Sequence, residues 1–475
     1  MIKLVKHQKD AVKNTIKQIK GGLGSTVGRI VIPTGGGKTF VEAAILDFQR
    51  KQNPKTRIHV VLAPRIVLCN QLIDEYRKFL GYSFRALAFH SGHHEPEDEN
   101  IDWAEQNTTS IEVVKKYHKD AQKSGVDLVV FSTYHSCDKL AGIDFDTMIA
   151  DESQYCVAEN FGENVKKISA RVKLFFTATE KFTASSKGRG LNNESLYGKR
   201  FYYIAPHILI KRGIIIPPRL HVMHGVVVGD KKQSLVDQVI QIGSAQHQLT
   251  VKKLKFSKIL FAMKGTDDVK TVLDNIKKIK EALPDHDIYT ITSKQGAQIN
   301  GQEVNRETEF MPTLKTTTKS CLIFHYDILS EGIDIDGITG VVLMRNLGLA
   351  KLLQTIGRAV RVYKPNPKLK PQAWISVPVL NGDEDDKERL KQIVTHMRLG
   401  GHNISKEDIV EFPGEERHEK DEDPMKDAYK KKKKNVGSKI VDDVLHRIEK
   451  EDFWLQVSAA KTMKQKIDVL FEEVL

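Results

Sequence analysis

Cysteine is scarce in this chain of 475 residues, which has four cysteines at widely separated positions: Cys69, Cys137, Cys156 and Cys321. No two of them form a Cys-x-x-Cys pair, so the sequence offers neither a disulfide framework nor a zinc module. Thiols used so sparingly are typical of a reducing compartment, where they act as small buried side chains.

Long apolar runs are also missing. No stretch approaches the ~18 apolar residues of a membrane span, and the N-terminus lacks the apolar core of a signal peptide. Hydrophobic residues make up 40% of the chain and charged residues 28%, which is typical of a soluble globular protein. A chain of this length can bury two substantial cores. We therefore expect a cytoplasmic protein.

An acidic excess is absent from most of the sequence. The net charge is +13 at pH 7, of which residues 1–380 carry +17 and residues 381–475 carry −4. A basic excess of this kind is expected of a surface that follows phosphates, and a generic basic surface is the alternative.

The most informative segment is the glycine-rich run Pro33-Thr-Gly-Gly-Gly-Lys-Thr39. It follows an apolar stretch at 29–32 and precedes a helical one at 40–46, which predicts a strand, a loop and a helix. Residues without a Cβ let backbone N–H groups come close to a phosphate. The candidate nucleotide-binding residues of this loop are Thr34, Gly35, Gly36, Gly37, Lys38 and Thr39.

Lys38 and Thr39 have distinct roles in this interpretation. Lys38 would reach the β- and γ-phosphate oxygens as a point charge, and the Thr39 hydroxyl would bind Mg²⁺. The strict pattern has a glycine where Ile32 stands. A glycine turn before a core helix is the alternative.

Two adjacent carboxylates, Asp151 and Glu152, follow a predicted strand at 147–150. The carboxyl end of a strand is where open α/β sheets bind ligands. Asp151 would hold Mg²⁺ through water, and Glu152 would polarise the attacking water as a general base. Taken alone, the pair could equally be an exposed acidic turn.

The third segment is Gln354-Thr-Ile-Gly-Arg-Ala-Val-Arg361. Arg358 and Arg361 are three residues apart on a predicted helix and would share one face, as they also would on a surface helix with salt bridges. A guanidinium brought to the nucleotide would stabilise charge in the transition state, an effect of about 10³ to 10⁵ in rate in other phosphoryl-transfer enzymes. The candidate catalytic residues are Lys38, Glu152, Gln354, Arg358 and Arg361.

In this order the segments resemble the motifs of superfamily 2 helicases and nucleic-acid translocases. Within that superfamily they are similar to the DEAD/H-like group, which includes phage branch-migration helicases and the motor subunits of type I and type III restriction enzymes. The resemblance covers residues 1–380, although the second motif reads Asp-Glu-Ser-Gln rather than Asp-Glu-Ala-Asp or Asp-Glu-x-His. Further segments fall in the family's order: Lys6-His-Gln8, Ala63-Pro-Arg65, Ser132-Thr-Tyr134, Thr177-Ala-Thr179, Lys258-Ile-Leu-Phe-Ala262 and Ser330-Glu-Gly-Ile-Asp334.

The resemblance implies a role for each of these segments. Residues implied to border the nucleotide are Gln8, as the adenine reader, Gly332 and Asp334. Residues implied to touch the nucleic-acid backbone are Pro64, Arg65, Ser132 and Thr133. Residues implied to couple hydrolysis to strand movement are Gln154, Thr177 and Thr179. ATP, Mg²⁺ and a nucleic acid are the implied ligands.

Apolar strands alternate with helical stretches twice along the chain, at 29–176 and again at 258–378. This alternation predicts an α/β fold with two tandem doubly wound parallel sheets, which the resemblance makes RecA-like domains. We predict domain 1 at 1–229, domain 2 at 230–380, and a charged linker with a small helical C-terminal module at 381–475.

Several polar segments interrupt this pattern. The histidines His90, His93 and His94 belong to a solvated loop or, less simply, to a metal site, and a helix begins near Ser110. Residues 181–197 are rich in Ser, Gly and Asn and predict a mobile loop. Lys430 to Lys434 form either a phosphate-binding patch or a solvated tail.

The leading hypothesis is an ATP-dependent DNA helicase or translocase in recombination, replication or repair, acting as a monomer in the cytoplasm of a bacterium or a phage-infected host. An RNA helicase is the competing enzyme, because backbone contacts do not report the sugar. A clamp or scaffold that binds ATP as a conformational switch is the alternative from another class. Retention of Lys38, Glu152, Arg358 and Arg361 argues against it.

Overall fold

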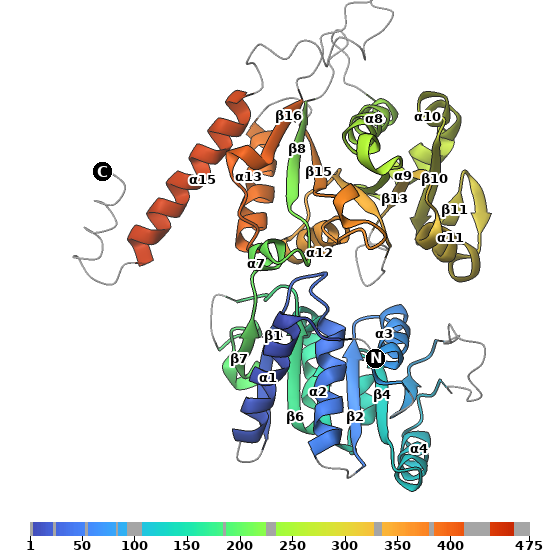
Figure 1. Cartoon of the computed structure of the whole chain (residues 1–475), viewed down its shortest axis with the longest axis vertical. Coiled ribbons are helices and arrows are strands. Elements are labelled where there is room, and N and C mark those ends of the chain that lie inside the picture. The colour runs from blue at the N-terminus through green and yellow to red at the C-terminus, as the bar shows by residue number, and fades with distance from the viewer. Residues whose placement is uncertain are drawn as a thin grey trace, which may run out of the picture. The chain divides into compact units, whose positions relative to one another are not determined.

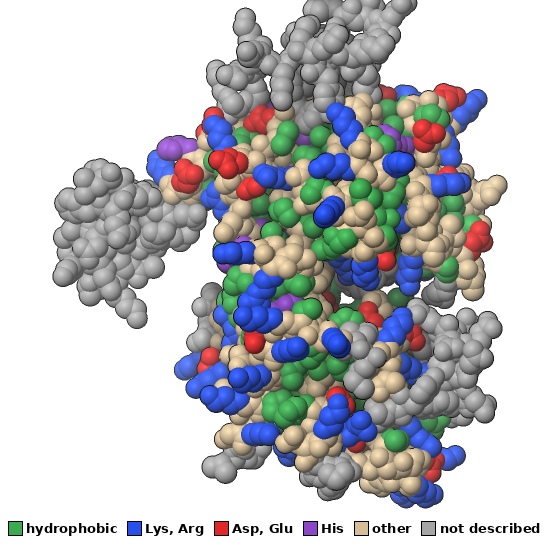
Figure 2. Space-filling model, viewed as in Figure 1, with side chains coloured by type: hydrophobic (Ala, Val, Ile, Leu, Met, Phe, Trp, Pro, Cys, Tyr) green, Lys and Arg blue, Asp and Glu red, His purple; other side chains and the backbone are tan. Residues whose placement is uncertain are grey.

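The computed structural model describes residues 3–21, 25–52, 56–81, 84–92, 107–183, 187–224, 234–326, 335–379, 384–412 and 438–459. The chain forms two compact units, Met1–Ile214 and Ile215–Leu475. Each unit is an α/β domain with a central sheet flanked by helices (Figure 1). Lys and Arg side chains are more frequent than Asp and Glu on the face shown in Figure 2.

The first unit is built on a seven-stranded sheet in the order β3-β4-β2-β5-β6-β1-β7. Every pairing in it is parallel, so the carboxyl ends of all the strands lie at one edge. Its strands are β1 (Thr26–Val31), β2 (Ile58–Ala63), β3 (Phe84–Phe89), β4 (Asp127–Thr133), β5 (Asp144–Ala150), β6 (Ser169–Thr177) and β7 (Lys199–Tyr203).

Helices cover both faces of this sheet, because alternate residues of the strands are buried on opposite sides. On one side Val60 and Leu62 of β2 pack in a cluster with Val114 of α4 (Ile111–Lys123). On the other side the Thr147 hydroxyl of β5 donates to Gln49 Oε1 of α2 (Lys38–Gln52) at 3.0 Å. The other helices are α1 (Lys6–Gly21), α3 (Ile66–Leu80), α5 (Glu159–Lys166), α6 (Glu194–Tyr197) and α7 (Pro206–Lys211).

The second unit has a nine-stranded mixed sheet in the order β12-β11-β10-β13-β9-β14-β15-β8-β16. Only the β10-β11-β12 edge is antiparallel. Its strands are β8 (Pro218–His224), β9 (Lys258–Ala262), β10 (His286–Thr292), β11 (Gly296–Ile299), β12 (Gln302–Val304), β13 (Ser320–His325), β14 (Ile338–Leu343), β15 (Ala373–Val379) and β16 (Ile409–Phe412).

Helices of the second unit connect these strands and close its C-terminal part. Its α-helices in the described ranges are α8 (Leu235–Leu254), α9 (Thr266–Asp274), α10 (Ile276–Ala282), α11 (Met311–Thr316), α12 (Leu349–Ala359), α13 (Glu384–Leu399) and α15 (Ser438–Ala459). Arg447 of α15 binds Glu384 of α13 at 2.7 Å, and Val444 and Ile448 of α15 are buried. Helix α15, which lies in the predicted C-terminal module, therefore packs against α13.

The predicted fold class is confirmed, since both units have the α/β, doubly wound arrangement. The division between them lies at Ile214/Ile215, earlier than the predicted 229/230, because β8 pairs with β15 and β16 in the second sheet. The residues beyond 380 do not form a module separate from the second unit, because β16 adds a strand to the sheet of that unit. The lysines at 430–434 and the charged stretch before them lie outside the described residues.

Among the described residues, no helix combines the length and apolarity that a membrane crossing needs. The four cysteines are free and buried. His90 is buried, with Nε2 3.0 Å from Asn70 Oδ1, whereas His93 and His94 lie outside the described ranges. No group of three or more His, Cys, Asp or Glu gathers as a metal site in the part of the chain that the structure describes.

Candidate nucleotide site

The glycine-rich loop connects β1 to α2, as predicted, and Lys38 is the first residue of the helix. The Gly36 N–H donates to the Pro33 carbonyl at 2.9 Å, which closes the turn. Gly35 and Gly37 have φ values of 83° and 76°, a backbone region that favours glycine. A Cβ at Gly36 would lie 2.5 Å from Ile32 Cγ2. The loop therefore requires these glycines, and its N–H groups precede a helix N-terminus that attracts anions.

Helix α1 packs over the outside of this loop. Gln8 Nε2 donates to the Gly36 carbonyl at 3.2 Å, and Gln8 Oε1 accepts from the Val5 N–H at 3.0 Å. The same carbonyl accepts from His7 Nε2 at 2.7 Å, and burial lowers the pKa of His7, so the ring is a neutral donor. Gln8 thus holds the phosphate loop in this structure, and its adenine-reading role stays a prediction. His7 was not singled out by sequence reasoning.

The two carboxylates lie at the end of β5, beside the lysine of the loop. Lys38 Nζ donates to Glu152 Oε1 at 3.1 Å, and the two side chains are 10% and 18% exposed. Burial alone would lower the pKa of Lys38, but the charges of Glu152 and Asp151 raise it above its ordinary value. Burial and the charge of Glu152 raise the pKa of Asp151. Lys38 therefore stabilises the charged forms of both carboxylates, whereas burial and the neighbouring charge of Glu152 disfavour the charged form of Asp151.

Glu152 sits in a left-handed backbone conformation, with φ of 50°. Non-glycine residues seldom adopt this region, and such strain often marks functional sites. The conformation lets the Glu152 N–H donate to Asp151 Oδ1 at 2.8 Å. In an extended strand the side chains of two successive residues would point to opposite faces of the sheet. This turn instead keeps the side chains of Asp151 and Glu152 together at the carboxyl edge of the sheet.

A chain of hydrogen bonds runs from this pair to the end of β6. Gln154 Nε2 donates to Glu152 Oε2 at 2.9 Å, and the Thr177 hydroxyl lies 2.6 Å from Gln154 Oε1. The Thr179 N–H donates to the Thr177 hydroxyl oxygen at 3.0 Å. The three residues predicted to couple hydrolysis to movement are thus connected to Glu152 by direct contacts.

The residues predicted to touch a nucleic-acid backbone lie at the carboxyl ends of β2 and β4. Arg65 is exposed and caps the N-terminus of α3, whereas Pro64, Ser132 and Thr133 are buried. The Ser136 N–H donates to the Thr133 hydroxyl at 3.2 Å, so that side chain stabilises the turn after β4. Of the four residues, Arg65 is the one whose side chain is exposed.

A buried acid behind the site was missed by the sequence analysis. Glu42 of α2 is 0% exposed and accepts from the Tyr76 hydroxyl at 3.3 Å. Burial, together with the charge of Asp151, raises its pKa. The Tyr134 hydroxyl, also buried, donates to the Asp151 carbonyl at 2.6 Å. These contacts are created by tertiary packing, so the sequence gives little indication of them. Its only signals are the hydroxyl of Tyr134 and the place of Glu42 in the helix after the loop.

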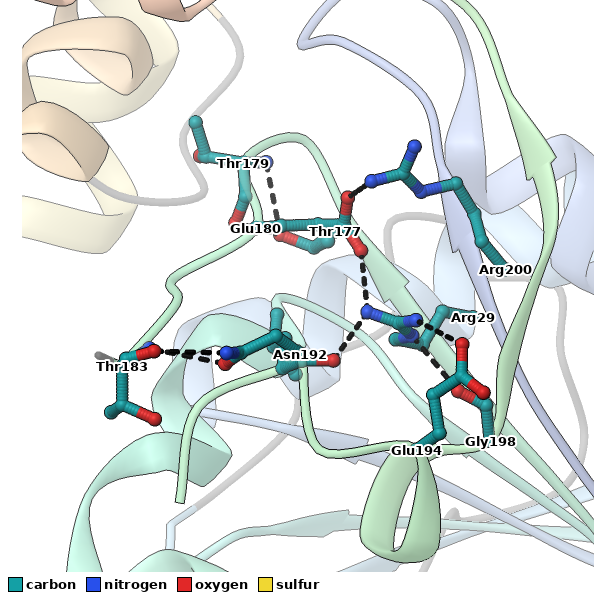
Figure 3. A network of polar contacts seen from close by, with 10 residues as sticks. Arg29, Thr177, Thr179, Glu180, Thr183, Asn192, Glu194, Gly198 and Arg200 are labelled. Carbon is teal, nitrogen blue, oxygen red and sulfur yellow. Dashed lines mark hydrogen bonds and ion pairs between the residues drawn. The ribbon is translucent and has the colours of Figure 1, made fainter. Parts of the chain in front are cut away.

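The segment after Thr179 is anchored by a buried ion-pair network (Figure 3). Glu180 accepts from Arg29 NH1 of β1 at 2.8 Å on one oxygen and binds Arg200 of β7 with the other. The Arg29 guanidinium also donates to the Gly198 carbonyl at 3.1 Å and to the Leu191 carbonyl. Within the described part of residues 181–197, the Leu191 carbonyl is therefore bonded to Arg29 of the sheet, and the mobility of this loop stays a prediction.

In the second unit the predicted arginine segment lies on and after α12. Gln354 and Arg358 are buried in the helix, which ends at Ala359, so Arg361 is outside it, contrary to the predicted shared helical face. The reason is a bridge between Arg361 and Ile215 and a hydrogen bond from the Ile216 N–H to the Val360 carbonyl at 2.8 Å.

A buried lysine that sequence reasoning missed completes this turn. Lys370 Nζ donates to the carbonyls of Ala359 and Arg361 at 2.6 and 2.8 Å. Burial lowers its pKa to about 7. It satisfies carbonyls that the end of α12 leaves open, and so fixes the backbone that carries Arg361. Gly332 and Asp334 lie outside the described residues.

The residues present fit a nucleotide with Mg²⁺. A Cβ at Gly37 would lie 2.3 Å from Gln8 Nε2, so the cradle depends on its glycines as a phosphate loop does. Thr39 and Asp151 provide a hydroxyl and a carboxylate, the hard oxygen donors that Mg²⁺ prefers. The buried carboxylate of Asp151 would gain most from such a cation, because burial penalises its charge.

Comparisons with known proteins agree with this arrangement. Residues 1–182 match the family model described as "Type III restriction enzyme, res subunit". A search of curated proteins found no match. The fold is similar to that of the ATP-dependent Type ISP restriction-modification enzyme LlaBIII bound to DNA, with 15% identity and a TM-score of 0.65 over 86% of this chain and 31% of that one.

Two other solved structures are similar. A nuclease-deletion mutant of the Type ISP enzyme LlaGI, in complex with a DNA substrate mimic, has 18% identity and a TM-score of 0.59 over 86% of this chain and 30% of that one. S. cerevisiae Dbp5 bound to RNA and ADP BeF3 has 13% identity and a TM-score of 0.52 over 86% and 90%. These similarities confirm the predicted tandem RecA-like fold. The chain spans about a third of the length of the two restriction enzymes.

We predict that Glu180→Ala lowers the free energy of unfolding by about 3–5 kcal/mol, because it leaves the buried Arg29 without its main counter-charge. Denaturant unfolding followed by circular dichroism measures the change. Glu163→Ala is the matched control, since it removes an exposed pair with Lys166 worth about 0–1 kcal/mol. Equal shifts in the two variants would contradict the anchoring role of Glu180.

Proposed function

We propose that this chain is a nucleic-acid-dependent ATPase of the helicase type, which couples ATP hydrolysis to movement on DNA. The observation that carries the proposal is the continuous contact from Lys38 through Glu152 and Gln154 to Thr177. It connects a phosphate-binding loop and a carboxylate base to the segment that follows β6. The family match over residues 1–182 supports the same reading.

In this mechanism Lys38 exchanges partners when a nucleotide arrives. Its ammonium, held by Glu152 at 3.1 Å, turns to the phosphate oxygens, and the loop N–H groups receive the β-phosphate. Glu152 is then free to accept a proton from the attacking water. Mg²⁺, held by Thr39 and Asp151, would neutralise charge that develops on the phosphates. Before ATP binds, the ion pair with Lys38 keeps Glu152 from acting as a base. The phosphates of ATP then take the place of Glu152 as the partner of Lys38.

The same exchange changes the hydrogen bonds of Gln154. When Glu152 turns toward water, the bond from Gln154 Nε2 weakens, and the amide carries this change to the Thr177 hydroxyl 2.6 Å away. That hydroxyl also accepts from the Thr179 N–H. We infer that the nucleotide state is passed to the Thr177–Thr179 segment by this route. The role proposed for Arg358 and Arg361 is to stabilise charge in the transition state.

DNA is the favoured substrate. The two restriction enzymes with similar folds were solved with DNA or a DNA mimic, whereas Dbp5 was solved with RNA. An RNA helicase is the second candidate, because backbone contacts of Pro64, Arg65, Ser132 and Thr133 would not distinguish the sugars. ATPase rates with single-stranded DNA, duplex DNA, a four-way junction and RNA decide between them.

The cellular role belongs to the proposal as well. A part in recombination, replication or repair, including branch migration, rests on the resemblance of the motifs. A monomeric state, a cytoplasmic location and a bacterial or phage origin also stay predictions. An ATP-dependent scaffold is the alternative, which a rapid turnover in the presence of nucleic acid would exclude.

We predict that Lys38→Ala and Glu152→Gln fail in different ways. Lys38→Ala removes a phosphate contact and should weaken ATP binding. Glu152→Gln removes only the base, so it should keep ATP affinity and lose about 10²- to 10⁴-fold in turnover. Fluorescent-nucleotide binding and steady-state ATPase assays measure both. Glu163→Gln, on the exposed face of α5, is the control. Near-normal turnover of Glu152→Gln would sink the assignment.

A second prediction concerns the relay. Thr177→Val should leave basal ATPase nearly unchanged and reduce its stimulation by nucleic acid at least about tenfold, because the bonds of the Thr177 hydroxyl to Gln154 and to the Thr179 N–H, each of about 1 kcal/mol, are both lost. Thr147→Val is the matched control, since its buried hydroxyl also bonds a glutamine, at 3.0 Å, but in the interior of β5. If both variants lose stimulation equally, the effect is one of packing and the relay is refuted.

For the second unit we predict that Arg358→Ala and Arg361→Ala each lower nucleic-acid-stimulated hydrolysis by about 10³-fold or more, as loss of a transition-state guanidinium does. Circular dichroism should show an intact fold, because the Arg361 bridge uses backbone atoms. Lys364→Ala, which removes a cation with a side chain 75% exposed, should retain full stimulation. Unchanged stimulation in both arginine variants would assign them to structure alone.

A further inference from the structure

Helix α1 carries a line of lysines that the nucleotide site does not use. Lys6, Lys9, Lys13, Lys17 and Lys20 are spaced by three or four residues and are all exposed, so they lie along one face. We propose that this lysine stripe binds the phosphate backbone of duplex DNA, as a second contact separate from Pro64, Arg65, Ser132 and Thr133. The proposal rests on the proposed function, and apart from Lys6, which begins the Lys6-His-Gln8 segment, the stripe consists of residues outside the motifs.

The stripe has a fixed direction because the opposite face of α1 is packed. The buried residues of the helix are His7, Gln8, Ala11, Thr15 and Ile16. Lys and Arg side chains gather in Figure 2 over the place that α1 occupies in Figure 1. The lysines therefore project outward from a helix that cannot rotate about its axis without exposing its core face.

The sequence of α1 contains one acidic residue, Asp10, beside the five exposed lysines, and in the described ranges it forms no ion pair with them. In the ranges that the structure describes, Lys6, Lys9, Lys13 and Lys17 form no ion pair, and Lys20 bonds only Gln52 and the ring of Phe48. Like charges at this spacing repel and destabilise an isolated helix. Lys6 also stands in the first turn, where the helix dipole disfavours a cation. A bound polyanion would remove both penalties.

Helix α4 shows the ordinary arrangement for comparison. There Lys115 pairs with Glu112 at 2.9 Å and Lys123 pairs with Asp120 at 3.6 Å, so acids lie between the bases. Interspersed charges of this kind are typical of a face that meets only solvent. Of these two lysine-rich helices of one unit, α1 is the one whose lysines form no ion pair in the ranges that the structure describes.

The dimensions of the stripe favour duplex DNA. From Lys6 to Lys20 the helix rises about 21 Å, at ~1.5 Å per residue. Phosphates of one duplex strand advance about 3.4 Å each along the axis, so the stripe would follow roughly six of them. A helix that binds a membrane presents Trp, Phe or Leu beside its lysines, but the apolar side of α1 is buried within the unit.

The same helix touches the phosphate loop from its inner face. His7 and Gln8 both donate to the Gly36 carbonyl, and they lie beside Lys6 and Lys9 in the chain. DNA bound along the stripe would therefore contact the same helix that holds the phosphate loop in place. We infer that the stripe contributes to the stimulation of ATP hydrolysis by DNA as well as to affinity.

The test uses the full chain with Lys9, Lys13 and Lys17 each changed to Gln, which keeps helix propensity and leaves Lys6 and Lys20 in place. Binding of a short DNA duplex is titrated at several salt concentrations. We expect the salt dependence, log K against log salt, to flatten by about 2 to 3, since each lost phosphate contact removes ~0.9. Affinity at low salt should fall at least about tenfold. ATPase activity without DNA should not change.

Two matched variants control for charge. Lys115→Gln, Lys116→Gln and Lys119→Gln on α4 remove the same charge from the same unit and should leave the slope unchanged. Lys9→Arg, Lys13→Arg and Lys17→Arg keep the charge and should keep the slope. If the stripe variant retains slope and affinity, or if the α4 variant loses as much as the stripe variant, the proposal is overturned.

Other polyanions test the identity of the partner. Stronger stripe-dependent binding of polyglutamate or of phosphatidylserine vesicles than of duplex DNA would overturn the assignment to nucleic acid. Failure of the proposed function has a different signature, because the unmodified chain would then show neither DNA binding nor DNA-stimulated ATPase. A chain that shows both, with an unaffected stripe variant, refutes this inference alone.

Discussion

The contact between the ammonium of Lys38 and the carboxylate of Glu152 holds together the parts of the first unit's site. Both groups are mostly buried, and each would be costly to leave charged without the other. They can meet only because parallel strands bring the ends of β1 and β5 to the same edge of the sheet. The left-handed backbone of Glu152 then turns its side chain toward the loop, so sheet topology and local strain act together.

Much of this site could be predicted from the sequence, because its motifs are short and continuous. The turn at Gly35 to Gly37 needs positive φ angles, and only glycine adopts them without strain. Strand ends could likewise be located from apolar runs that stop at Pro33 and at Asp151. In such cases a residue's role depends on its own neighbours in the chain, which the sequence displays.

The missed contacts join residues that are far apart in the chain. Arg29 and Glu180 are separated by 151 residues, and nothing in either segment indicates the other. The strand β8 was missed for a related reason, since Pro217 precedes it, Pro218 begins it, and the run 218–224 mixes His and Arg with apolar residues. Its place in the second sheet depends on pairing with β15 and β16, which local pattern does not encode.

The arginine segment shows how a motif can have a local structure that differs from the one its spacing suggests. Spacing suggested one helix for Arg358 and Arg361, but the helix ends before Arg361 because other groups bind the backbone there. Lys370 satisfies the carbonyls at the helix end, and the Ile216 N–H takes the Val360 carbonyl. Ile215 and Ile216 are the first residues after the first unit ends. The backbone that precedes Arg361 is therefore bonded to the segment through which the chain enters the second unit, so any displacement of that segment would act directly on the arginine.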